Sequence, residues 1–136
     1  MICLDTNVAI ALLGGDQSPV RRRFEEALVR GEAMAASTVV LFELWFGAEK
    51  SVRRAHNIRK IQELVASPVH VLNFDEADAA EAGEIRSHLG RAGTPIGPYD
   101  LLIAAQARRR NALLVTANIR EFARVPHLQT EDWTVL

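Results

Sequence analysis

The stretch Ile2-Cys3-Leu4-Asp5-Thr6-Asn7, at the start of the chain, predicts a short buried strand that runs directly into a helix. Residues 6–13 are apolar around most of the helical circumference, which favours a largely buried helix that ends at Gly14 and Gly15. A strand followed at once by a helix is typical of α/β domains, whose ligands bind at the carboxyl ends of the strands. We therefore expect Asp5 to lie at a ligand-binding edge of the sheet.

Short apolar runs and helical patterns continue to alternate along the rest of the chain. Ser18 and Pro19 form a helix-start signal. Helices are expected over residues 21–30, 38–50, 52–65, 75–91 and 99–110, and strands over residues 1–4, 33–36, 69–73 and 112–116, with one edge strand within 125–136. The sequence therefore predicts an α/β fold with a central, mostly parallel sheet flanked by helices, in a single domain that covers residues 1–136.

The composition is that of an ordinary globular domain. Of the 136 residues, 49% are hydrophobic and 24% are charged, which argues against a disordered or fibrous chain. Cys3 is the only cysteine and cannot form an internal disulfide, which favours a reducing compartment. The apolar start of the chain lacks the basic segment and cleavage site of a signal peptide, and no run of about 18 apolar residues occurs. We expect a cytoplasmic protein without a membrane span.

The basic residues are almost all arginine, and ten of the sixteen lie in three clusters. The chain has 16 lysines and arginines against 17 acids, so the net charge of -1 indicates nothing about nucleic acid. Arginine suits phosphate contacts and base stacking, but on charge alone we interpret the clusters as solvated helix faces. The clusters are Arg21 to Arg23; Arg53, Arg54, Arg59 and Lys60; and Arg108 to Arg110.

Three carboxylates lie where solvation does not explain them. Asp5 follows a buried strand, Glu43 interrupts the apolar stretch 39–46, and Asp100 begins an apolar helix. Each also has a purely structural explanation: Asp5 as a helix N-cap, Glu43 as the partner of an arginine, and Asp100 as an acid that favours the helix dipole. Together they point to one edge of the sheet, where repelling carboxylates would need a cation such as Mg²⁺ or Mn²⁺. Such an ion could activate water and neutralise phosphate charge, as in metal-dependent nucleases.

The acids at the start of residues 75–91 are interpreted differently. Asp75, Glu76 and Asp78 would lie in the first turn of that helix, where the helix dipole favours anions. Solvation and the dipole would explain them without any chemistry.

Four short motifs follow one another along essentially the whole chain. They are residues 4–7; Ser37 with Glu43-Leu44 and Gly47; Asp100 with Ile103, Ala104, Ala105 and Ala107; and residues 116–122 followed by Val125-Pro126. In this order they resemble the motifs of PIN-domain ribonucleases, and specifically of the VapC-type toxins of bacterial type II toxin-antitoxin pairs. The resemblance implies a PIN-like form of the predicted α/β fold.

The resemblance also implies a function. A protein of this kind is a Mg²⁺-dependent endoribonuclease, with Mn²⁺ as a substitute ion, that cleaves specific RNA, either tRNA or rRNA. It is neutralised by a cognate antitoxin protein, and we expect a homodimer. Asp5, Glu43 and Asp100 would be the catalytic acids that bind the metal, Asp5 and Asp100 above all. The supporting residues would be Thr6, Asn7, Ser37, Thr116 and Asn118.

An antitoxin would need a docking surface on this chain. The resemblance suggests a groove for an amphipathic antitoxin helix, lined by some of the apolar residues Val8, Leu12, Trp45 and Phe46. Core packing is the default explanation for the same residues.

The last motif departs from the family at Asn118, where many relatives carry a fourth aspartate. Asn118 and Glu121 have the spacing of a capping box, in which each side chain bonds to a backbone N–H group of a short helix. This structural role explains both residues and is the preferred interpretation. The alternative makes Glu121 a substitute fourth acid in catalysis, bound to the metal directly or through water.

Two other functions are weighed against the nuclease. A catalytically weak PIN-like RNA-binding or regulatory module would explain the neutral Asn118. Asp5-Thr6-Asn7 has the outline of the Asp-x-Asp motif of haloacid dehalogenase-type phosphatases, but Asn7 replaces the second acid. A zinc cluster is excluded because the one cysteine and four histidines lack ligand spacing, and no glycine-rich phosphate loop of the GxxxxGK[ST] type is present.

Overall fold

A parallel sheet forms the centre of the protein. The structure is a computed structural model that describes residues 1–15 and 18–135. Within these residues five strands form one sheet in the order β3-β2-β1-β4-β5, and all neighbouring strands are parallel. The strands are β1 (Ile2–Leu4), β2 (Met34–Ser37), β3 (His70–Leu72), β4 (Leu113–Val115) and β5 (Gln129–Glu131). The predicted α/β fold with a central parallel sheet is confirmed.

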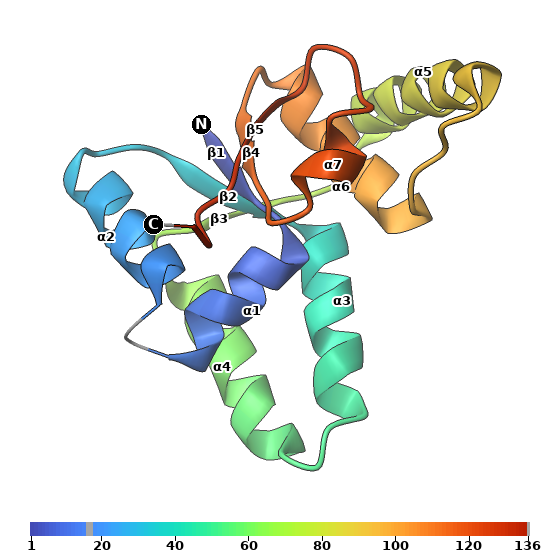
Figure 1. Ribbon diagram of the computed structural model, residues 1–136. Coiled ribbons are helices and arrows are strands. Elements are labelled where there is room, and N and C mark those ends of the chain that lie inside the picture. The colour runs from blue at the N-terminus through green and yellow to red at the C-terminus, as the bar shows by residue number, and fades with distance from the viewer. Residues whose placement is uncertain (16–17, 136) are drawn as a thin grey trace.

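Helices cover the sheet on both sides (Figure 1). They are α1 (Thr6–Gly14), α2 (Pro19–Val29), α3 (Thr38–Glu49), α4 (Arg54–Ala66), α5 (Glu76–Ala92), α6 (Pro98–Arg109) and α7 (Ile119–Phe122). Helices α1 to α4 gather on one side and α5 to α7 on the other (Figure 1). The chain builds outward from β1 to β3 and then returns to place β4 on the other side of β1. The carboxyl ends of β1 and β4 therefore form the switch point at which α/β sheets bind ligands.

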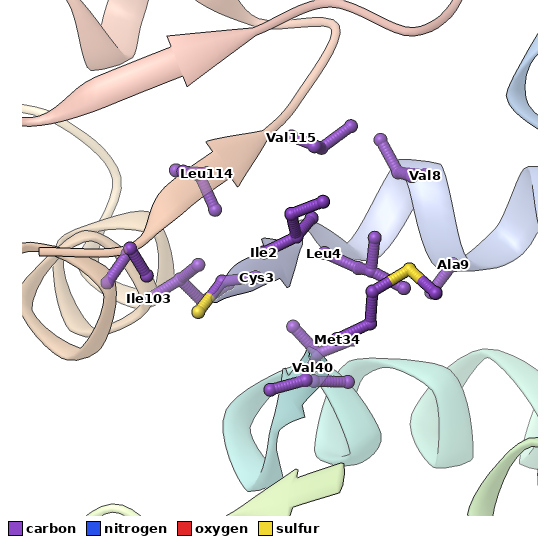
Figure 2. Close-up of a cluster of buried hydrophobic side chains, with 14 of the residues drawn as sticks. Ile2, Cys3, Leu4, Val8, Ala9, Met34, Val40, Ile103, Leu114 and Val115 are labelled. Atoms are coloured by element: carbon purple, nitrogen blue, oxygen red, sulfur yellow. The ribbon is translucent and has the colours of Figure 1, made fainter. Parts of the chain in front are cut away.

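The core is built around β1. All residues of β1 and β2 are buried, because strands between two helical layers have both faces covered. Figure 2 shows Ile2 and Leu4 of β1 among Met34, Val40 and Leu114 from the neighbouring elements. Burial raises the pKa of the Cys3 thiol to about 11, so this side chain stays protonated in the core.

The structure shifts several predicted boundaries by one or two residues, and one predicted environment is different. Ser18 caps α2 by accepting a hydrogen bond from the Arg21 N–H at 3.1 Å, which confirms the start signal. The predicted edge strand is β5, while Leu136 lies outside the described residues. Helix α1 is less buried than expected, since Ile10 is 51% exposed and only one face of the helix meets the core. No helix within the described ranges is long and apolar enough to span a membrane.

The largest difference from the sequence-based interpretation concerns Asp78, which is fully buried rather than solvated. The Arg109 Nε–H and Arg110 Nη1–H groups donate hydrogen bonds to Asp78 Oδ1 at 2.7 and 2.9 Å. The prediction of solvated helix faces is therefore wrong for this arginine cluster. Its third member, Arg108, donates to Glu81 and Glu84 of α5.

This cluster joins α5 to α6, the helix that begins near Asp100. Burial would raise the pKa of Asp78, but the hydrogen bonds from Arg110 and Arg109 outweigh that effect and hold the pKa well below its usual range. Asp78 also completes a capping box with Asp75 at the start of α5. One buried carboxylate thus links the first turn of α5 to the last turn of α6.

We expect Asp78→Asn to destabilise the protein by about 3–5 kcal/mol, because it removes one partner of a buried charge cluster. Urea denaturation followed by circular dichroism measures the change. Glu49→Gln is the matched control, since the Glu49 and Arg54 side chains form an exposed pair, and its midpoint should stay close to that of the wild type. An unchanged midpoint for Asp78→Asn would contradict the structural role given to this cluster.

Candidate active site

Asp5 lies at the carboxyl end of β1 and is buried. Its Oδ1 accepts the Thr6 N–H at 2.8 Å as the N-cap of α1, which confirms the structural interpretation of this residue. Its Oδ2 accepts the Thr116 hydroxyl at 2.7 Å from the residue that follows β4. Burial raises the pKa of Asp5, and the hydrogen bonds from Thr116 and Thr6 oppose that shift only in part. The side chain is therefore held in one orientation at the switch point of the sheet.

Glu43 lies in the second turn of α3 and is half-buried. The Thr6 hydroxyl donates a hydrogen bond to Glu43 Oε1 at 2.6 Å. The alternative in which an arginine neutralises Glu43 is wrong, because no ion pair among the described residues includes it. Thr6 therefore links Glu43 to the turn that also holds Asp5.

Asp100 lies in the first turn of α6 and is half-buried. Burial raises the pKa of Asp100 to about 7, and the negative charges of Asp5, Glu121 and Glu43 contribute to the same shift. The structure therefore brings the four predicted acids within electrostatic reach of one another.

Glu121 on α7 does not take part in the predicted capping box. Asn118 makes no side-chain cap, because its backbone is not in the extended conformation usual for an N-cap. Instead, the Asn118 Nδ2–H donates to Glu121 Oε2, while the Gly97 N–H donates to Glu121 Oε1 at 2.8 Å. The carboxylate of Glu121 is therefore turned toward the start of α6, and the capping prediction is wrong.

Gly97 also belongs to the site, although it was not among the site residues predicted from the sequence. A Cβ atom at this position would lie 3.2 Å from Asp100 Oδ2 and 3.7 Å from Glu121 Oε1. The backbone can approach both acids because glycine has no side chain. The available signal was a glycine just before the helix-starting proline, three residues ahead of Asp100.

The supporting residues named from the sequence divide into two groups. Thr6, Thr116 and Asn118 make hydrogen bonds to the acids, and the Asn118 N–H also donates to Thr116 Oγ1 at 3.0 Å. Ser37 instead caps α3 by accepting the Val39 N–H at 2.9 Å, and no bond from Ser37 to an acid occurs among the described residues. Asn7 is exposed.

The donor set fits a hydrated, hard divalent cation. All four side chains offer carboxylate oxygens, and within the described ranges none of them forms an ion pair with a basic residue. Over residues 1–15 and 18–135, no group of three or more His, Cys, Asp or Glu side chains stands close enough together to hold a metal ion by itself. Mg²⁺ is usually bound by one or two carboxylates with water completing its shell, so the open cluster suits such an ion.

Residues 2–128 match the PIN domain family, and the match contains all four acids. The chain belongs to the PIN domain family. Related PIN-domain ribonucleases are in general metal-dependent, in agreement with the all-carboxylate donor set.

Several relatives are similar over almost their whole length. The chain is 45% identical over 131 residues to the tRNA(fMet)-specific endonuclease VapC of Shigella flexneri, covering 96% of each protein. It is 36% identical over 130 residues, with the same coverage, to the ribonuclease VapC2 of Haemophilus influenzae. These relatives are nucleases by name.

Solved structures agree with the PIN domain fold. VapBC2 from Rickettsia felis, bound to a DNA fragment from its promoter, matches with a TM-score of 0.90 and 34% identity over 98% of this chain and 99% of that chain. DNA-bound VapBC from Salmonella typhimurium matches with a TM-score of 0.88 and 38% identity over 97% of both chains. The predicted PIN-like fold is therefore confirmed.

The raised pKa of Asp100 predicts how stability depends on pH in the metal-free protein. The carboxyl group ionises near 3.8 in an unfolded chain and near 7 in this site, so the folded state binds more protons between these values. The contribution of Asp100 to the free energy of unfolding is therefore fully present below about pH 4 and is lost as the pH rises through 7. Between pH 5.5 and pH 8, the melting temperature of the metal-free wild type should therefore fall by more than that of Asp100→Asn.

Differential scanning calorimetry in the presence of EDTA measures both variants. Millimolar Mn²⁺ at pH 8 should restore the melting temperature of the wild type more than that of Asp100→Asn, because an ion that binds only the folded state stabilises it. Parallel pH profiles for the two proteins would contradict the proposed crowding of charge at Asp100.

Proposed function

We propose that this PIN domain is a metal-dependent endoribonuclease that cleaves specific RNA in the cytoplasm and acts as a toxin silenced by a cognate antitoxin. The observation that carries the proposal is the meeting of Asp5, Glu43, Asp100 and Glu121 at the switch point of the sheet. The Shigella flexneri relative is named a tRNA(fMet)-specific endonuclease. Transfer RNA is therefore the first substrate class to test, with rRNA as the second.

Mg²⁺ is the proposed ion, with Mn²⁺ as a substitute. Both prefer the carboxylate oxygens that this site offers, and Asp5 and Asp100 are the proposed ligands. When bound, the ion would lower the pKa of a coordinated water molecule and neutralise charge on the phosphate. This ion would also relieve the repulsion that raises the pKa of Asp100.

The side chains Asp5, Glu43 and Glu121 have different proposed roles in the reaction. Thr6 and Thr116 hold the Asp5 carboxylate in place, so it would bind the ion without having to reorient. Thr6 holds Glu43 through Oε1, which would leave Glu43 Oε2 to accept a proton from the water that attacks the phosphorus. The P–O bond to the leaving ribose oxygen would break, and that oxygen would take a proton from solvent. Glu121 would then complete the charge of the site in place of the aspartate that many relatives carry at Asn118.

The alternative of a catalytically weak module rested on the neutral side chain of Asn118. In the structure, Asn118 donates a hydrogen bond to Glu121, so a carboxylate is present beside it. This contact favours the enzyme over the inactive module. The phosphatase alternative lacks its second acid, because Asn7 stands at that position and is exposed.

Asp100→Asn tests the enzymatic proposal. This change keeps the size of the side chain and removes one charge, so cleavage of a tRNA pool in Mg²⁺ should fall roughly 100-fold or more while the protein stays folded. EDTA should abolish wild-type cleavage, and added antitoxin should inhibit it. Asp75→Asn is the matched control, since asparagine is an equally good N-cap for α5. Wild-type rates for Asp100→Asn would remove this residue from the machinery.

Glu121→Gln tests the fourth acid. Glutamine keeps one oxygen to accept the Gly97 N–H, and its amide nitrogen can donate to Asn118 Oδ1 once the Asn118 amide turns over. The metal-free protein should therefore melt almost as the wild type does. The loss of one charge should raise the Mg²⁺ concentration needed for half-maximal cleavage. If titrations of the two proteins superimpose, Glu121 has only a structural role and the site has three functional acids.

We further propose that the antitoxin docks in a groove between α1, α3 and α4. The groove has a volume of about 710 Å³ and extends to Glu43. Its lining includes Ile10, Leu13 and Leu44 together with Arg53, which suits an amphipathic helix with an acidic edge. The matched VapBC structures support an antitoxin partner for proteins of this fold. An occupant would cover Glu43 and exclude RNA.

The four residues that the sequence suggested for such a groove lie in different surroundings. Val8 is fully buried and belongs to the core, whereas Leu12 lies in the wall of the groove. Trp45 packs partly against the core. Phe46 is 58% exposed and is not part of the groove. The expected homodimer remains a prediction.

A further inference from the structure

Three exposed aromatic side chains on α3 and α6 have no role in the proposed chemistry. Phe42 is 50% exposed and immediately precedes Glu43, while Tyr99 is 45% exposed and immediately precedes Asp100. The rings of Phe42 and Tyr99 meet edge to face, with centroids 5.4 Å apart and an interplanar angle of 60°. Phe46 lies one turn further along α3. We call Phe42, Phe46 and Tyr99 the aromatic shelf.

Core packing does not account for the aromatic shelf. Helix α3 buries Val40, Leu44 and Ala48 against the sheet, and Phe42 and Phe46 follow a different face of the same helix. The edge-to-face contact of Phe42 with Tyr99 joins α3 to α6, the two helices that carry Glu43 and Asp100. It also leaves part of both rings open to solvent. The shelf therefore spans the two helices that carry Glu43 and Asp100.

A cation completes the surface. Lys50 Nζ lies 4.8 Å from the centroid of the Phe46 ring. Its positive charge could meet a phosphate on the strand whose base contacts the shelf. An aromatic surface beside a basic group is the arrangement that proteins use to bind unpaired nucleotides.

We propose that the aromatic shelf stacks an unpaired base of the RNA substrate next to the scissile phosphate, and this inference rests on the proposed nuclease function. Sequence-specific recognition of RNA is directed mostly at single-stranded loops, whose bases are splayed out and stacked on aromatic side chains. Phe42 and Tyr99 would contact the base, and Lys50 would contact the backbone. The shelf would thus restrict cleavage to loops and would position the strand against the acids.

The size of the shelf favours a base over a second protein. Three half-exposed aromatic rings offer roughly 300 Å² of accessible surface, since each aromatic side chain can bury about 150–250 Å² in total. A stable protein interface buries about 800 Å² on each partner. The shelf by itself therefore suits one or two nucleobases and is too small to hold two copies of this chain together.

The test compares Tyr99→Leu, which removes the ring, with Tyr99→Phe, which keeps it. With a hairpin RNA that the wild type cleaves, kcat/KM should fall roughly 10- to 100-fold for Tyr99→Leu, mostly through KM, and should stay near the wild-type value for Tyr99→Phe. With an RNA that has an abasic site in place of the stacked base, the wild type and Tyr99→Leu should cleave equally. Equal loss on both RNAs would overturn the inference.

A binding experiment identifies the base directly. 2-Aminopurine is placed at each loop position in turn, and the RNA is mixed with Asp100→Asn in Mg²⁺ so that it is bound but not cleaved. Fluorescence should be quenched at one position, and the quenching should be lost in Asp100→Asn/Tyr99→Leu but kept in Asp100→Asn/Tyr99→Phe. The absence of quenching at every position, with binding verified by gel shift, would overturn the inference.

Two further measurements distinguish a failure of the aromatic-shelf proposal from a failure of the proposed nuclease function. Analytical ultracentrifugation of Tyr99→Leu should give the mass of the wild type, and a drop to half that mass would show that the shelf is a protein interface. If the wild type cleaves no RNA in Mg²⁺, the proposed function fails, whereas wild-type cleavage with an unaffected Tyr99→Leu variant overturns the shelf alone.

Discussion

Electrostatic repulsion among four carboxylates is the constraint around which this structure is organised. Burial and the charges of Asp5, Glu121 and Glu43 raise the pKa of Asp100 to about 7, and the described part of the chain supplies no basic partner for it. Side chains under such repulsion would turn toward solvent unless other contacts held them. The Thr6, Thr116, Asn118 and Gly97 hydrogen bonds hold three of the four acids.

The rest of the fold supplies the stability that this arrangement lacks. A core centred on β1 (Figure 2) fixes β1 and β4, the strands that Asp5 and Thr116 directly follow. On the far side of α6, buried Asp78 pairs with Arg109 and Arg110. An excess of negative charge at one end of α6 is thus accompanied by a neutralised charge cluster at its other end. The division suits the proposed function, in which the site accepts a cation and a polyanion.

The surface around the acids offers two different recognition regions. The groove between α1, α3 and α4 is mostly apolar with basic residues in its lining, which suits a protein helix. The aromatic shelf on α3 and α6 is small and open, which suits a nucleobase. Glu43 lines the groove, and Phe42 of the shelf immediately precedes Glu43 in the sequence. An inhibitor in the groove and a substrate on the shelf would therefore compete at the same carboxylates.

The sequence by itself determined the alternation of strands and helices, the parallel sheet, and the positions of Asp5, Glu43 and Asp100, because these depend on local periodicity and on where strands end and helices begin. Only the tertiary structure decided which distant groups meet. The Thr6 hydroxyl bonds to a carboxylate 37 positions away, Gly97 bonds to Glu121, and Asp78 is buried against arginines that look solvated in the sequence. Such pairs have no local signal, since helix packing sets them. For the same reason, the spacing of Asn118 and Glu121 indicated a cap, whereas the fold turns Glu121 toward the start of α6.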